Sequence, residues 1–176
     1  MPHRLQSATL TAAQGRALLV AADTPNARAT VALLVAAGLA GREAVQLTLP
    51  DDYDRAGRRL RVRRDDGRYR VIRLADVAAD ALDAVLAEPR VPGWWRGSWT
   101  RRTEVMIHAL TETRHRAGVR ADGAALRHLA IRTAWNAATP EQVGAYFGVY
   151  GMPLARGTAD YGIPAALDAV LGTPCG

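Results

Sequence analysis

The sequence predicts one mainly α-helical domain that carries a small antiparallel β-hairpin. Helix-start signals recur along the chain, alanine is abundant, and aromatic residues make up only 6%, which together are typical of packed helices. One stretch, 60–74, instead alternates apolar and charged residues with a period of two, as a half-buried strand does. The length of 176 residues fits a single domain over 1–176.

Three helices are expected before the hairpin. Thr11 and Gln14 form a T-x-x-Q capping box that opens the first helix. A second helix begins at Asp23-Thr24-Pro25, because proline suits the first helical position, and its apolar run ends near Gly38. A short third helix holds residues 43–47.

The hairpin is expected to fold around the turn signal Asp65-Asp66-Gly67. Before the turn, residues 60–63 alternate leucine and valine with arginine, and a second apolar-rich stretch, 69–74, follows it. We therefore expect one apolar face and one arginine face. Because an isolated two-stranded hairpin is unstable in water, the apolar face must rest on helices.

Helices dominate the rest of the chain. Asp76 opens one helix, and the Pro/Gly-rich stretch 88–98, which contains Trp94-Trp95, ends it as a loop. Thr139-Pro140-Glu141-Gln142 is a second capping box. After the loop, helices are expected over about 100–116, about 124–136, 140–147 and 164–171.

Positive charge is concentrated in the hairpin region. The net charge is +6, and all 23 basic residues are arginine. Part of that count fits a GC-rich coding sequence, and a solvated surface is the plain interpretation. However, nine arginines fall within 19 residues: Arg55, Arg58, Arg59, Arg61, Arg63, Arg64, Arg68, Arg70 and Arg73. Planar guanidinium groups bind phosphate bidentately, so the cluster suits a nucleic-acid backbone. The same cluster would also serve an acidic protein or an anionic membrane surface, although no amphipathic basic helix supports the membrane option.

Several classes of protein are disfavoured by the sequence. No apolar run is long enough to cross a bilayer, and the N-terminus lacks a secretory signal pattern. Cys175 is the only cysteine, so nothing indicates an oxidising compartment, and a cytoplasmic protein is expected. The four histidines do not complete a metal site, and no Gly-rich phosphate loop occurs. We therefore expect neither a metal nor a cofactor.

Five short motifs occur one after another along the chain. They are Leu10 to Leu19 (a pattern like LTxxE…LL), Leu33 to Leu47 (like LLxxTGLRxxExxxL), the hairpin with Leu74, Ala124 to Gly148 (like HxLRH…G…LGH) and Thr158 to Gly162 (like TxDxYGH). In this order they resemble the catalytic domain of tyrosine recombinases, the phage-integrase family. No single motif is strong alone, and the resemblance depends on their collinear order over nearly the whole chain.

The resemblance implies phosphoryl transfer from DNA to a tyrosine. Family members use a tyrosine hydroxyl to form a covalent 3′-phosphotyrosine, assisted by two arginines, a lysine and histidines that stabilise charge and move protons. Arg127, within Leu126-Arg127-His128, matches the second arginine, and Tyr161 matches the nucleophile. The alternative for Arg127 is a helix arginine paired with a carboxylate, and for Tyr161 a tyrosine with no chemical role.

The other catalytic positions depart from the family pattern. Ala40 stands where the first arginine is expected, and Arg42 lies about 200° further round a helix. The hairpin lysine is replaced by Asp65 or Asp66, and the two histidines by Ala124 and Val149. The site is therefore expected to be degenerate. If the protein retains catalytic activity, Arg127, Tyr161 and a relocated Arg42 are the residues expected to carry out the reaction.

Three functional hypotheses follow from these observations. The first is a non-catalytic protein that binds double-stranded DNA, a regulator or accessory factor associated with a bacterial nucleoid. Its expected DNA contacts are Arg61, Arg63, Arg64, Arg68, Arg70, Arg127 and His128. The second is an active recombinase that acts through Tyr161.

The third hypothesis is a protein-interaction module on the same fold. Trp94, Trp95 and Trp99 would be its interface anchors. Family members also pass their C-terminal helix to a neighbour, so residues 163–171 would dock on a second copy or fold back on their own chain. The separate N-terminal core-binding domain of the family is expected to be absent, so that one half of the DNA clamp is either missing or comes from another chain.

Overall fold

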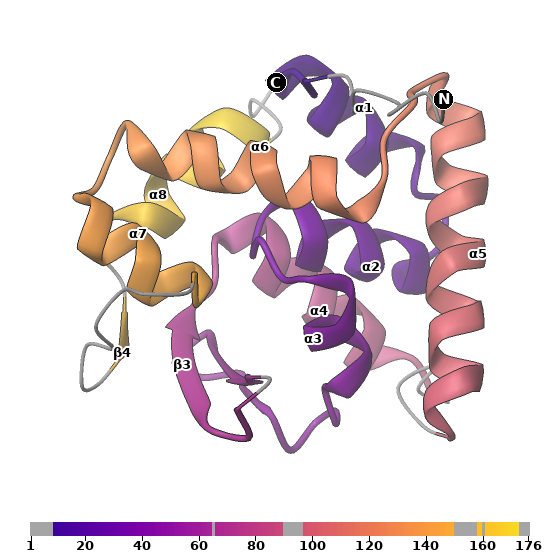
Figure 1. The fold of residues 1–176 in the computed structure, drawn as a ribbon. Helices are drawn as coiled ribbons and strands as arrows, with labels where there is room; N and C mark the ends of the chain where they lie inside the picture. The colour runs from indigo at the N-terminus through magenta and orange to yellow at the C-terminus, as the bar shows by residue number, and fades with distance from the viewer. Residues whose placement is uncertain (1–8, 65, 90–96, 150–157, 160, 173–176) are drawn as a thin grey trace, which may run out of the picture.

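The computed structural model describes residues 9–64, 66–89, 97–149, 158–159 and 161–172 of the chain. Over these ranges the chain is mainly helical with one small sheet, as the sequence predicts (Figure 1). The elements are α1 (Ala12–Ala21), α2 (Pro25–Val35), α3 (Gly41–Gln46), β1 (Tyr53–Asp54), β2 (Arg59–Arg63), β3 (Tyr69–Arg73), α4 (Asp76–Ala87), α5 (Trp99–Ala117), α6 (Gly123–Trp135), α7 (Pro140–Phe147), β4 (Thr158–Ala159) and α8 (Ile163–Leu171). None of the helices in these ranges combines the length and apolar character needed to cross a bilayer.

The helix-start signals in the sequence are confirmed. Thr11 and Gln14 cap each other at the start of α1, and Thr139 and Gln142 do the same at α7. The side chain of Thr24 caps α2, with Pro25 as its first residue. Each cap supplies a hydrogen-bond acceptor to a backbone N–H that the helix itself leaves unpaired.

The predicted hairpin is the centre of a four-stranded sheet in the order β1-β2-β3-β4. Strands β1, β2 and β3 are antiparallel, whereas β4 pairs with β3 in the parallel sense. The outer strands β1 and β4 have two residues each. Strands this short have no period-two pattern to recognise, which explains why the sequence indicates only the hairpin.

The register of the hairpin corrects one expectation about its faces. Val62 pairs with Arg70, and Leu60 pairs with Ile72. Since paired residues project to the same side of a sheet, Arg70 lies on the buried face together with the three apolar side chains. The arginine face therefore does not include Arg70, which is 7% exposed.

Helix α2 forms the centre of the hydrophobic core. It packs against α1, α4, α5 and α6, which surround it in Figure 1. Every side chain from Ala29 to Val35 is buried. Burial of each leucine in this run contributes about 1.5–3 kcal/mol. The core thus fixes the C-terminal end of α2, from which the chain turns into α3 and the candidate site.

The C-terminal helix α8 packs on its own chain. Ile163, Leu167 and Leu171 are buried in the core. The carboxylate of Asp168 accepts hydrogen bonds from the backbone N–H groups of Asp76 (2.7 Å) and Val77 (3.0 Å). Helix α4 has no side-chain cap of its own, so α8 supplies that cap across the fold.

Candidate nucleic-acid interface

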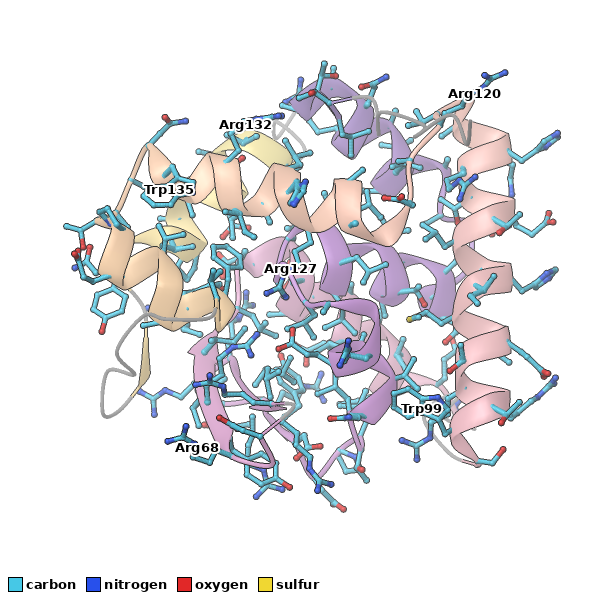
Figure 2. All side chains as sticks on the ribbon, viewed as in Figure 1. Arg68, Trp99, Arg120, Arg127, Arg132 and Trp135 are labelled. Carbon is cyan, nitrogen blue, oxygen red and sulfur yellow. The ribbon has the colours of Figure 1, made fainter. Side chains whose placement is uncertain are left out.

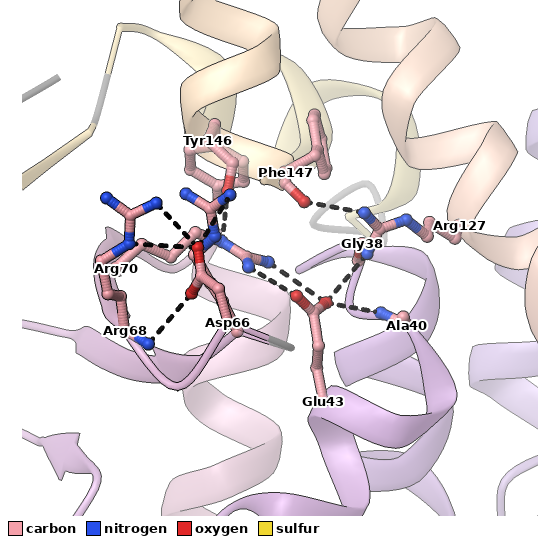
Figure 3. A network of polar contacts seen from close by, with 10 residues as sticks. Gly38, Ala40, Glu43, Asp66, Arg68, Arg70, Arg127, Tyr146 and Phe147 are labelled. Carbon is pink, nitrogen blue, oxygen red and sulfur yellow. Dashed lines mark hydrogen bonds and ion pairs between the residues drawn. The ribbon is translucent and has the colours of Figure 1, made fainter. Parts of the chain in front are cut away.

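A buried carboxylate, Glu43 on α3, lies between two arginines (Figure 3). Arg70 of β3 binds it in a forked arrangement, with Nη1 2.5 Å from Oε1 and Nη2 3.2 Å from Oε2. Arg127 of α6 places Nη1 2.9 Å from Oε2. Because these residues come from three separate elements, the carboxylate joins α3, the sheet and α6. We call Glu43, Arg70 and Arg127 the Glu43 network.

Backbone carbonyls complete the Glu43 network. Arg70 donates from Nε to the carbonyl of Tyr146 (3.0 Å). Arg127 donates from Nη1 to the carbonyl of Gly38 (2.9 Å) and from Nη2 to that of Phe147 (2.7 Å). Three of the five N–H groups of Arg127 are thus committed to the protein itself. The end of α7 carries orphan carbonyls that suit such donors.

Two glycines make the close packing around this network possible. Gly38 and Gly148 both have positive φ, 62° and 65°. A Cβ on Gly38 would stand 2.2 Å from the ring of Phe147, and one on Gly148 would stand 2.6 Å from Nη1 of Arg70. A side chain at either position would therefore clash as well as strain the backbone.

Glu43 is charged in the folded protein. Burial by itself raises the pKa of its carboxyl group. The hydrogen bond and charge of Arg70, the N–H of Ala40 and the charge of Arg127 outweigh that effect, and the pKa lies below the ordinary value of 4.5. The carboxylate of Glu43 is therefore ionised at neutral pH.

An open cavity of about 390 Å³ lies beside the network, and arginines from three elements line it. Arg42 comes from α3, Arg64 directly follows β2 and Arg127 comes from α6. The full lining is Ala40, Arg42, Glu43, Arg64, Asp66, Arg127, His128, Ile131, Gly148 and Val149. We call it the first cavity.

A second cavity, of about 460 Å³, shares two arginines with the first. It is lined by Arg42, Gln46, Arg63, Arg64, Gly67 and Trp99. The exposed indole of Trp99 is at the start of α5 (Figure 2). The two cavities together form a basic surface between α3, the hairpin and α6.

The turn of the hairpin, residues 63–68, is called the hairpin tip here. The carboxylate of Asp66 accepts from Nε (3.1 Å) and Nη2 (2.9 Å) of Arg68, and it stands 3.7 Å from Nη2 of Arg64. Nη1 of Arg64 is buried and has no hydrogen-bond partner among the residues that the structure describes. Arg63 is exposed and pairs with no carboxylate in the part of the chain that the structure describes. Fewer carboxylates than guanidinium groups are present at this tip.

The structure brings together some of the predicted DNA contacts and separates others. Arg64, Arg127 and His128 line the first cavity, and Arg63 lines the second. The predicted contacts that lie outside both cavities are Arg61, Arg68 and Arg70. Arg61 pairs with Asp52 at 2.8 Å, Arg68 projects from the tip, and Arg70 is buried against Glu43.

The expected catalytic residues are also only partly brought together. Arg42 and Arg127 line the first cavity, but Tyr161 does not. Tyr161 is half-buried, packs against the core and has a φ of 47°. Ala40 and Val149, at positions where the resemblance implies an arginine and a histidine, both line the first cavity.

Sequence reasoning missed the roles of two acidic residues at this site. Glu43 appears in the motif pattern without a function, and no local signal marks it as the partner of Arg70 and Arg127, which are distant in sequence. Asp66 is expected only to form a turn, and it also binds Arg68. Trp94, Trp95 and Asp65 lie outside the described residues. No group of three or more potential metal ligands occurs within the described ranges.

Comparison with known proteins relates this fold to a recombinase. The chain is similar to the crystal structure of XerA recombinase, with a TM-score of 0.65 and 19% sequence identity. The alignment covers 94% of this chain and 60% of the XerA chain, so this chain spans less than two thirds of that protein. No protein-family model and no curated protein matches the sequence. At this identity the likeness establishes a tyrosine-recombinase-like fold alone.

Proposed function

We propose that this chain binds the phosphate backbone of double-stranded DNA with the basic surface around the two cavities, and does not cleave it. The observation that carries the proposal is the first cavity, where Arg42, Arg64 and Arg127 line one space. These residues are far apart in sequence, and their three guanidinium groups outnumber the two carboxylates in the same lining, Glu43 and Asp66, so the cavity carries a net positive charge that favours an anion. The recombinase-like fold favours DNA as the source of that anion.

Phosphate groups suit this surface for a geometric reason. A guanidinium group offers parallel N–H donors that match two phosphate oxygens. Within the described part of the chain, Nη1 of Arg64 is a buried donor without an acceptor. Leaving such a donor unpaired costs about 1–3 kcal/mol, so a phosphate oxygen at that position would be favourable. Arg63 and Arg68 then extend the surface along the hairpin tip, where successive phosphates pass.

The same cavity argues against strand cleavage. Ala40 and Val149 supply no charge or proton where the family's chemistry needs an arginine and a histidine. Removal of one charge-stabilising donor typically costs about 2.7–4 kcal/mol of transition-state stabilisation. Arg127 is held by three protein acceptors. DNA binding tolerates these losses, because affinity depends on total phosphate contact rather than on one reacting centre.

The test is a salt titration of duplex binding with matched variants. Arg63→Ala/Arg68→Ala removes two exposed arginines of the tip, and Arg28→Ala/Arg120→Ala removes two exposed arginines outside both cavities. We expect the tip variant to bind about tenfold or more weakly and to lower the salt slope by about 2. The control should behave like the unmodified protein. Equal losses in both variants, or no binding of the unmodified protein, would contradict the proposal.

Cleavage is tested separately with a nicked DNA substrate that traps covalent intermediates. We expect no covalent protein–DNA adduct on a denaturing gel. An adduct that forms with the unmodified protein and disappears in Tyr161→Phe would show an active nucleophile, and would replace the non-catalytic proposal by the recombinase hypothesis.

A further inference from the structure

The second cavity combines a flat aromatic ring with guanidinium groups. Trp99 is 52% exposed. An indole left this open to water keeps a large apolar surface unburied. Arg63 and Arg64 of the hairpin line the same cavity, together with Arg42 of α3. A tryptophan beside several guanidinium groups is therefore a composite site rather than an apolar groove.

A ligand that satisfies both halves of this site carries a planar ring and an anionic group. Nucleotides have this composition, since a base stacks on an aromatic side chain while its phosphate binds arginine. In an intact duplex both faces of each base are covered by neighbouring base pairs. A base can therefore stack on a protein ring only where it is unpaired or leaves the helix.

The position of the second cavity connects it to the proposed path of the DNA backbone. Arg42 and Arg64 line both cavities, so a phosphate between them belongs to both. The N-terminus of α5 lies at Trp99, and the positive end of the helix dipole there favours an anion. A strand whose phosphate occupies the first cavity would therefore continue into the second, which Trp99 lines.

We infer that the second cavity binds an unpaired DNA nucleotide, with its base stacked on Trp99 and its phosphate held by Arg42, Arg63 and Arg64. The inference rests on the proposed function, because it assumes that DNA reaches this surface. It adds a preference that duplex binding alone does not give: DNA with a gap, a frayed end or a displaced base binds more tightly than the same duplex fully paired.

The experiment compares two DNA molecules and four proteins. Fluorescence anisotropy measures the affinity for a fully paired duplex and for the same duplex with a single-stranded gap. The proteins are the unmodified chain, Trp99→Ala, Trp99→Phe and Trp135→Ala. Trp135 is the matched control, since its side chain is 48% exposed and lines neither cavity.

We expect the unmodified protein to prefer the gapped duplex. Trp99→Ala should lose about 5- to 150-fold in affinity for gapped DNA, the range that loss of one base–aromatic stack produces, and should keep its affinity for paired DNA. Trp99→Phe should retain part of the preference, because phenylalanine still stacks. Trp135→Ala should match the unmodified protein.

A fluorescent purine analogue placed in the gap gives a direct readout of stacking. Its emission should be quenched by the unmodified protein and not by Trp99→Ala. Equal affinities for gapped and paired DNA, or an unchanged preference in Trp99→Ala, would overturn the inference and leave the proposed function standing. If neither DNA binds, the proposed function itself is wrong. Circular dichroism of each variant shows that the fold is retained.

Discussion

The Glu43 network and the hairpin tip use arginine in opposite ways. In the network, Arg70 and Arg127 share one buried carboxylate and donate to backbone carbonyls. At the tip, Arg64 and Arg68 lie near the exposed carboxylate of Asp66, and Arg63 is exposed to solvent. The two regions are joined by strand β3, since the tip ends where that strand begins.

The difference between them follows from burial and not from residue type. A buried guanidinium group without a partner carries a large desolvation cost, so a network arginine must be paired with protein atoms. An exposed guanidinium group keeps water as its partner and can exchange that water for a phosphate. Of the arginines that cluster in a sequence, therefore, only those whose side chains stay exposed in the fold can form a binding surface.

The largest expected effect is on stability, from Arg70→Met. This change removes the forked ion pair and leaves Glu43 buried with one arginine fewer, which should lower the free energy of unfolding by about 3–5 kcal/mol. Urea unfolding followed by circular dichroism measures it. Arg68→Met at the tip is the matched control and should cost about 1 kcal/mol or less, because its ion pair is exposed. If both variants lose a similar amount of unfolding free energy, the arginines of the Glu43 network and of the hairpin tip do not differ in their contribution to stability.

The second prediction concerns acid. Folding lowers the pKa of Glu43, so its contribution to stability is complete above about pH 4.5 and is lost as the pH falls through the folded-state value. The effect should be smaller than that of Arg70→Met, because a protonated glutamate still accepts hydrogen bonds. Thermal melting across this pH range should show a steeper acid decline in the unmodified protein than in Glu43→Gln. Parallel declines would contradict an ionised network.

A third prediction tests whether the carboxylate at the tip competes with DNA. The amide N–H and guanidinium group of Arg68 hold the pKa of Asp66 below its usual value, so Asp66 is charged at neutral pH. Asp66→Asn keeps a hydrogen-bond acceptor for the turn and removes the charge. Affinity for duplex DNA should rise about two- to fivefold at low salt, with a smaller gain at high salt. An unchanged or reduced affinity would mean that Asp66 does not oppose phosphate binding.

The fold was largely predictable from the sequence because its signals are local. Thr11 with Gln14 and Thr139 with Gln142 mark helix starts through contacts three residues apart, and the period-two run marks the hairpin. The two-residue strands β1 and β4 depend on pairing with distant strands, which no local pattern encodes. The cap of α4 by Asp168 is a contact across 92 residues and was equally hidden.

The candidate site was predictable only in part, for the same physical reason. The sequence indicates which residues are arginines, and the resemblance selects Arg127. The partners of those arginines are set by the fold. Arg70 and Arg68 stand two positions apart, yet one is buried against Glu43 and the other projects into solvent. The indole of Trp99 joins a cavity with Arg63 only through tertiary packing.

The smallest expected effect distinguishes two arginines on the same exposed face of β2. Arg61 binds Asp52 at 2.8 Å and lies 5.0 Å from the centre of the Tyr69 ring, whereas Arg63 lines the second cavity. A phosphate contact by Arg61 would require its ion pair to break. At near-physiological salt, where long-range charge effects are screened, Arg61→Ala should weaken DNA binding by less than about twofold and Arg63→Ala by more. Anisotropy titrations of the two variants measure the difference. If Arg61→Ala weakens binding as much as Arg63→Ala does, the bound DNA exchanges the Asp52 pair for a phosphate, and the interface extends along the whole strand.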